Sequence, residues 1–130
     1  MARFETLPTV SYVGGKYPWM LDAALIYHSD LVGKLVVPAG YCTDFASVPR
    51  LPVVYWWTGG RAVLPSIIHD HCYDCRTKEM SRRTADRVFL EAMKARRDPK
   101  RAVTRWAMYQ GVRLGGWRAW ARDSSGKCVK

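Results

Sequence analysis

Residues 62–75 read AVLPSIIHDHCYDC, and this stretch decides where strands give way to helices. Its apolar residues recur at intervals of three and four, namely Leu64, Ile67, Ile68, Cys72 and Cys75. That spacing predicts a helix with one buried face. Pro65 fits only the first turn of a helix, so the helix should begin near it.

The same stretch carries a dense set of polar side chains, His69, Asp70, His71, Tyr73 and Asp74. At about 100° per residue, His69 and Tyr73 share one helix face and Asp70 and Asp74 share another, while His71 points to the far side. His69 and Asp70 can still border one cleft. An imidazole beside a carboxylate suits either a metal site or a general base held in one tautomer.

The residues before this helix are typical of strands. TVSYV (9–13), ALIYH (24–28) and KLVV (34–37) are short β-rich runs separated by Gly, Pro and Ser-Asp. The second and third runs should form a hairpin through residues 29–33. Residues 38–50, PAGYCTDFASVPR, should leave the sheet as an ordered loop, because their prolines and glycine resist helix.

Two further helices are expected after the first. One follows Ser81, a good N-cap, and buries Ala85, Val88, Phe89, Ala92 and Met93. The other opens at Asp98-Pro99 and ends at Gly115-Gly116, with Ala102, Val103, Trp106, Ala107 and Tyr109 or Gln110 inward. The predicted fold is α+β, a small N-terminal antiparallel sheet packed against about three C-terminal helices. Residues 1–122 should form a single domain, followed by a polar tail at 123–130.

The chain has 130 residues and a formal net charge of +10, which indicates an acidic partner. The excess of Lys and Arg over Asp and Glu lies mainly after Arg76, so the C-terminal half carries most of the positive charge. The simpler interpretation of these charges is that they lie on solvent-exposed helix faces. No apolar run is long enough to cross a membrane, and the start lacks the apolar stretch of a signal peptide. We therefore expect synthesis in the cytoplasm and four reduced cysteines. Cys72 and Cys75 are predicted to be buried thiols, although His71 and Cys75 have the spacing to chelate zinc.

The candidate site combines this helix with the loop before it and the helix after it. The catalytic candidates are His69, Asp70, Asp44 and Tyr73; the substrate-binding candidates are Arg50 and Ser47; the metal candidates are Asp44, His69, Asp70 and Asp86. Zinc, manganese or calcium would suit such ligands. Asp86 could instead form an ion pair with Arg82, four residues earlier on the same helix.

Three linked motifs resemble a known family. VPAGYCTDFASVPR, IIHDHCYDC and SRRTADRVFLEAM occur in the order found in small bacteriophage and prophage proteins of the domain of unknown function 1353 family. The matching positions are Asp44, Ser47, Pro49, Arg50, His69, Asp70, Tyr73, Ala85 and Asp86. The resemblance implies a phage or prophage origin and supplies no activity.

A narrower likeness concerns residues 69–73, which look like the His-Asp-x-Cys-Tyr helix of secreted phospholipases. In that family the His activates water, the Asp binds calcium and the Tyr bonds to a distant Asp. The resemblance would assign these roles to His69, Asp70, Tyr73 and Asp86. The glycine-rich calcium loop and the disulfide framework of that family are missing from this sequence.

Three functions follow as expectations. The first is a phage-encoded small hydrolase with a His/Asp-centred, metal-dependent site, acting on an anionic cell-envelope polymer. The second is a non-enzymatic virion, baseplate or tail-associated protein, in which the polar cluster stabilises the fold and Trp106, Trp117 and Trp120 bind other phage structural proteins. Such a protein would be made in the host cytoplasm and incorporated in the virion. The third, nucleic-acid binding, rests on charge alone.

Overall fold

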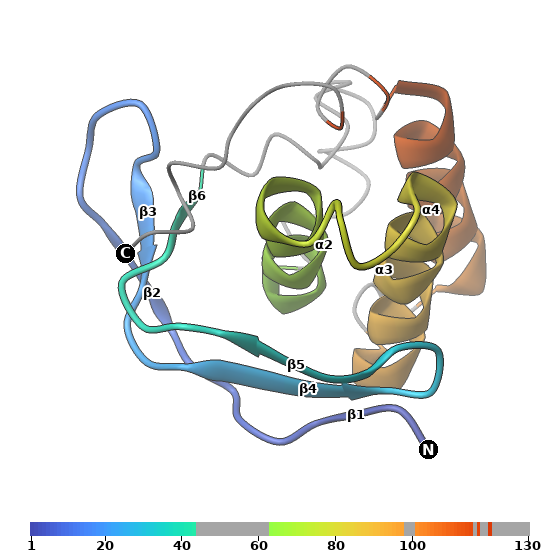
Figure 1. Cartoon of the computed structure of the whole chain (residues 1–130), viewed down its shortest axis with the longest axis horizontal. Coiled ribbons are helices and arrows are strands. Elements are labelled where there is room, and N and C mark those ends of the chain that lie inside the picture. Colours follow the sequence, from blue (N-terminus) through green and yellow to red (C-terminus); the bar gives the residue numbers. More distant parts are fainter. Residues whose placement is uncertain (44–62, 98–100, 116, 118–119, 121–130) are drawn as a thin grey trace.

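The computed structural model describes residues 1–43, 63–97, 101–115, 117 and 120. Its six strands are β1 (Arg3–Phe4), β2 (Val10–Tyr12), β3 (Trp19–Leu21), β4 (Leu25–Ser29), β5 (Gly33–Val37) and β6 (Cys42–Thr43). Its helices are α2 (Val63–Cys75), α3 (Arg82–Arg96) and α4 (Ala102–Gly115). The order of strands before helices confirms the α+β prediction (Figure 1).

The strands form two antiparallel sheets of three, where one small sheet was predicted. One has the order β1-β4-β5 and the other β2-β3-β6. The predicted hairpin is confirmed, since β4 pairs with β5 and Ser29 lies opposite Gly33. Gly33 has φ 83°, a conformation that glycine adopts without strain, and the Ser29 hydroxyl accepts hydrogen bonds from the amides of Leu31 and Val32.

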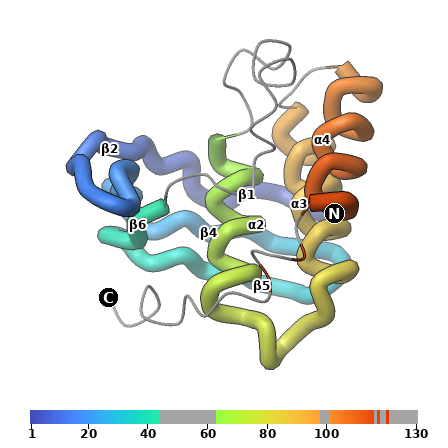
Figure 2. Tube along the Cα trace, turned by 90° about the horizontal axis from the view of Figure 1, so that it is seen from above, coloured from blue at the N-terminus to red at the C-terminus, as the bar shows by residue number. Residues whose placement is uncertain are grey.

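The main core lies between the β1-β4-β5 sheet and helices α2 and α3. Alternate residues of the hairpin, Leu25, Tyr27, Leu35 and Val37, are buried on the face that the helices cover. Figure 2 shows α2, α3 and α4 side by side, with β4 and β5 running beneath the first two.

The start of α3 and its buried face match the sequence prediction. The Ser81 side chain accepts a hydrogen bond from the amide of Thr84, which confirms Ser81 as the N-cap. All five residues predicted to face inward on this helix are buried, namely Ala85, Val88, Phe89, Ala92 and Met93. Apolar residues that recur with the 3.6-residue period of the helix were therefore enough to predict which face of α3 is buried.

The predicted inward face of α4 is wrong. Thr104, Met108 and Val112 are the buried residues, whereas Val103 and Trp106 are 51% and 55% exposed. The cause is that α4 packs on α3 rather than across a sheet, meeting Phe89 and Met93 through a narrow row of residues four apart. Apolar residues surround most of this helix, so their period alone did not select a face. The predicted cap at Asp98-Pro99 and residues 123–130 lie outside the described residues, and so does Gly116.

The cysteines differ partly from expectation. Cys72 is a buried free thiol, as predicted, and Cys42 is also free. Cys75 is disulfide-bonded, so the expectation that all four cysteines stay reduced is wrong. Cys75 is the last residue of α2 and is only partly buried. None of the described helices is long and apolar enough to cross a membrane.

Candidate functional site

The helix α2 presents its polar residues on two separate faces, as the sequence predicted. His69 and Tyr73 point toward α3, where both contact one carboxylate oxygen of Asp86. Asp70 and Asp74 point toward the end of the strand region instead. There the Thr43 hydroxyl donates to Asp70 and the Tyr41 hydroxyl donates to Asp74 over 2.6 Å. His69 and Asp70 are neighbours in sequence and yet serve different networks.

Asp86 is the centre of the first network. Its Oδ1 lies 2.7 Å from His69 Nε2 and accepts a 2.5 Å hydrogen bond from the Tyr73 hydroxyl. Its Oδ2 accepts hydrogen bonds from Arg113 at 2.8 Å and from Arg82 at 3.4 Å. Both carboxylate oxygens are therefore occupied by side chains from α2, α3 and α4. Both expectations for Asp86, contact with His69 or Tyr73 and an ion pair with Arg82, are realised together.

The protonation of this network follows from its contacts. Burial raises the pKa of Asp86, but the hydrogen bonds and charges of its neighbours outweigh burial and hold that pKa below its ordinary value. The largest favourable contribution comes from His69, followed by Tyr73 and Arg113. Burial also raises the pKa of Tyr73, and so does its bond to Asp86. Asp86 is thus an anion and Tyr73 a neutral donor at neutral pH.

The second nitrogen of His69 has a different environment. Within the described part of the chain, Nδ1 of His69 is buried and has no hydrogen-bond partner. The ring packs against Tyr73 at 4.3 Å and Phe89 at 4.7 Å between centroids. A His that engages a carboxylate through one nitrogen keeps the other available as a proton acceptor or a metal ligand. His69 itself is 0% exposed, so an external molecule reaches Nδ1 only after the surrounding residues move.

The second network ties the strand region to α2. Tyr41 is 1% exposed and its ring meets His71 edge-on, with centroids 5.3 Å apart. Burial raises the pKa of Tyr41, and the charges of Asp70 and Asp74 raise it further. The bond from Thr43 to Asp70 anchors the residue immediately before Asp44. Asp44 itself, with Ser47 and Arg50, lies outside the described residues.

Sequence reasoning missed three of these partners. Arg113 comes from α4 and lies 27 residues from Asp86. Tyr41 and Thr43 lie within the predicted loop and its motif but were not among the candidate site residues, and only the fold brings them to α2. Trp120, predicted as an interface residue, instead packs edge-on against Tyr73 with centroids 5.1 Å apart. The polarity and spacing of residues along the chain do not predict contacts between residues this far apart in the sequence.

The predicted metal ligands are not grouped in the described structure. No cluster of three His, Cys, Asp or Glu side chains suited to a metal ion occurs among residues 1–43, 63–97, 101–115, 117 and 120. Asp70 belongs to the Thr43 network, whereas His69 and Asp86 bond to each other. The pairing of Cys75 in a disulfide also removes its thiolate from the zinc site considered with His71.

Comparison with known proteins gives one match. The family model described as "Protein of unknown function (DUF1353)" matches residues 19–112, a region that contains every described member of the two networks except Arg113. No curated protein and no solved structure has a significant match to the chain.

Proposed function

We propose that this chain, which belongs to the DUF1353 family of proteins of unknown function, is a small hydrolase with His69 as its general base. The observation that supports this is the His69 imidazole, bonded to Asp86 through Nε2 and left without a partner at Nδ1 among the described residues. Asp86 fixes the tautomer and stabilises the imidazolium that forms when Nδ1 takes a proton from water. Tyr73 and Arg113 hold the carboxylate in place.

The substrate side of the site would come from the loop that follows Thr43. In this proposal Arg50 and Ser47 bind an anionic group of the substrate, and Asp44 contributes a carboxylate to the site. An anionic cell-envelope polymer of a phage host fits the net charge of +10. Buried Nδ1 requires that this part of the molecule opens during each catalytic cycle.

A divalent metal would enter this site in one of two ways. Asp44 and Asp70 supply oxygen ligands, which suit calcium or manganese. Nδ1 of His69 could add a nitrogen ligand, because a metal-binding His commonly donates its other N–H to a carboxylate, as His69 can to Asp86. Asp86 is less suited to direct ligation, since both of its oxygens already accept hydrogen bonds. Zinc would favour the version with His69.

The test compares His69→Gln with the matched control His28→Gln. His28 lies on β4 and bonds to Glu5 on the surface, so its loss leaves the Asp86 network intact. We expect the parent and His28→Gln to hydrolyse at least one of phospholipid vesicles, peptidoglycan and wall teichoic acid, and His69→Gln to lose at least 100-fold in kcat/KM, roughly the lower bound for a general base. Equal activity in both folded variants, or no hydrolysis by the parent of any of the three, would refute the proposal.

Elemental analysis of protein purified without chelator tests the metal. Stoichiometric calcium, manganese or zinc that is lost in Asp44→Asn and His69→Gln supports the metal-dependent form. A metal-free parent that still hydrolyses substrate supports His69 acting on water alone. Circular dichroism of each variant separates loss of metal from loss of fold.

The second candidate is a non-enzymatic phage structural protein, at the virion, baseplate or tail. It is supported by the complete burial of His69 and Asp86, which suits a network that locks α2 to α3. Trp106 and Trp117 are each 55% exposed and would serve as contacts to other phage proteins. Under this proposal Trp117→Ala lowers particle yield without lowering Tm. An unchanged yield of particles would contradict it.

A further inference from the structure

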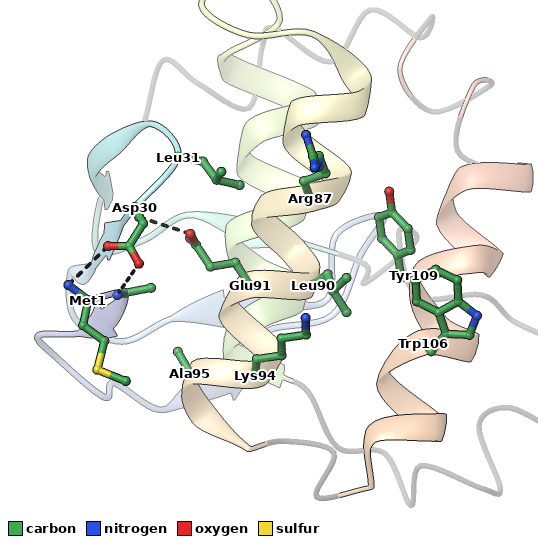
Figure 3. A pocket seen from close by; sticks show the side chains of 11 residues that line it. Met1, Asp30, Leu31, Arg87, Leu90, Glu91, Lys94, Ala95, Trp106 and Tyr109 are labelled. Atoms are coloured by element: carbon green, nitrogen blue, oxygen red, sulfur yellow. Dashed lines mark hydrogen bonds and ion pairs between the residues drawn. The ribbon is translucent and has the colours of Figure 1, made fainter.

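A groove runs along α3, and its lining includes none of the residues of the buried Asp86 network. Its volume is about 630 Å³. Figure 3 shows Arg87, Leu90, Glu91 and Lys94 along one face of α3, with Trp106 and Tyr109 projecting from α4 on the far side. The opposite wall is formed by the start of the chain and by Asp30 and Leu31 in the β4–β5 turn.

The acidic side chains of the groove have hydrogen-bond partners, whereas its basic side chains have no ion-pair partner among the described residues. Asp30 accepts a hydrogen bond from the amide of Ala2, and Glu91 accepts bonds from Tyr27 and from the amide of Asp30. These bonds direct both carboxylates toward the strand wall (Figure 3). Arg87 and Lys94 are exposed, and neither forms an ion pair with any carboxylate of the described residues. They lie seven positions apart on α3, about 10 Å along the helix axis.

The aromatic wall is open to a ligand. Trp106 is 55% exposed, although large aromatic side chains usually contribute buried area. Its ring lies 5.6 Å from that of Tyr109, with the planes inclined by 38°. The two rings therefore form a stepped aromatic surface in the same groove as Arg87 and Lys94. Arg97, the C-cap of α3, is also exposed and follows Lys94 by three residues.

We propose that this groove binds single-stranded nucleic acid, with bases stacked on Trp106 and Tyr109 and phosphates bound by Arg87 and Lys94. Proteins that hold single strands combine a basic track with aromatic rings, because every base has a π-face and every linkage a charge. This groove would then be the binding site of the acidic partner that the net charge of +10 indicates. The proposal is independent of hydrolysis at His69, which is not among the residues that line the groove.

The experiment measures fluorescence anisotropy of a labelled 12-nucleotide oligo(dT) with the full chain, over a range of salt concentrations. A matched abasic oligomer keeps the phosphates and removes the bases. We expect the oligo(dT) to bind at least about fivefold more tightly than the abasic strand, as one stacked base requires. We also expect affinity to fall as salt rises. Equal binding of the two strands, no binding at low salt, or displacement by polyglutamate as effective as by oligo(dT) would overturn the proposal.

Matched variants locate the site on the surface. Trp106→Leu should weaken oligo(dT) binding about fivefold or more, whereas Trp117→Leu, which is equally exposed but does not line the groove, should leave it unchanged. Arg87→Gln should weaken binding and lower its salt dependence, whereas Arg83→Gln, one turn earlier on α3, should do neither. If both variants of a pair lost the same affinity for oligo(dT), any exposed tryptophan or arginine would contribute equally. That result would refute the assignment of binding to the groove. Thermal melts of all four verify that each is folded.

Discussion

Replacing Asp86 with asparagine is the most direct test of the buried network. The change keeps the volume of the side chain and removes its charge. The side chains of His69, Tyr73 and Arg113 lie within 2.8 Å of the carboxylate oxygens. The Arg82 guanidinium lies 3.4 Å away. The amide keeps one acceptor oxygen but turns its own donors toward Arg82 and Arg113.

The expected cost follows from the loss of a buried, paired charge. Removing one partner of such a pair destabilises a protein by about 3–5 kcal/mol, because the remaining charges lose their compensation. The two arginines are partly exposed, so we expect the lower end of that range, about 3 kcal/mol. For a chain of this length that corresponds to a fall in Tm of roughly 10–15 °C.

The pH dependence gives a second, independent signature. The folded pKa of Asp86 lies below its ordinary value, so its contribution is fully present above the unfolded carboxyl pKa of about 3.9. That contribution is lost as the pH falls through the lower folded pKa. The stability difference between the parent and Asp86→Asn should therefore be full at pH 7 and shrink below about pH 4.

Urea denaturation followed by circular dichroism, at pH 7 and at several acidic values, measures both effects. Arg83→Gln is the control, since Arg83 is exposed on the same helix and its loss should change stability by less than about 0.5 kcal/mol. A loss below about 1 kcal/mol in Asp86→Asn, or a difference that stays constant down to pH 2.5, would refute the electrostatic reasoning.

Three further predictions follow from single contacts. Tyr73→Phe removes the donor to Asp86 and keeps the ring, so urea unfolding should show a loss of about 1–2 kcal/mol; no change would mean that the hydroxyl contributes nothing. Ser81→Ala removes the N-cap of α3 and should cost about 1 kcal/mol by the same assay, with Ser81→Asn nearly neutral; equal losses in both would exclude capping. Burial raises the pKa of the Cys72 thiol to about 12, so iodoacetamide at pH 8 should label Cys72 only after unfolding; rapid labelling of the native protein, located by peptide mass, would contradict its burial.

Much of the fold was predictable because it depends on local patterns. The β4–β5 hairpin follows from two short apolar runs separated by a polar turn with Gly33, and α3 follows from its Ser81 cap and one clear apolar face. The separation of His69 and Tyr73 from Asp70 and Asp74 needed only the helical repeat. The face of α4 could not be predicted, because its apolar residues are spread around the helix and its position is set by Phe89 and Met93 of α3.

The sequence by itself determined the α+β order of elements, the polar residues of α2 and the candidacy of Asp86, since each depends on neighbours within one or two helical turns. Only the tertiary structure decided that Arg113 reaches Asp86, that Thr43 and Tyr41 hold the other face of α2, and that Trp106 shares a groove with Arg87 and Lys94. These contacts join residues that are distant in the chain. Their geometry comes from packing the hairpin and the helices around a shared core, which a one-dimensional repeat does not encode.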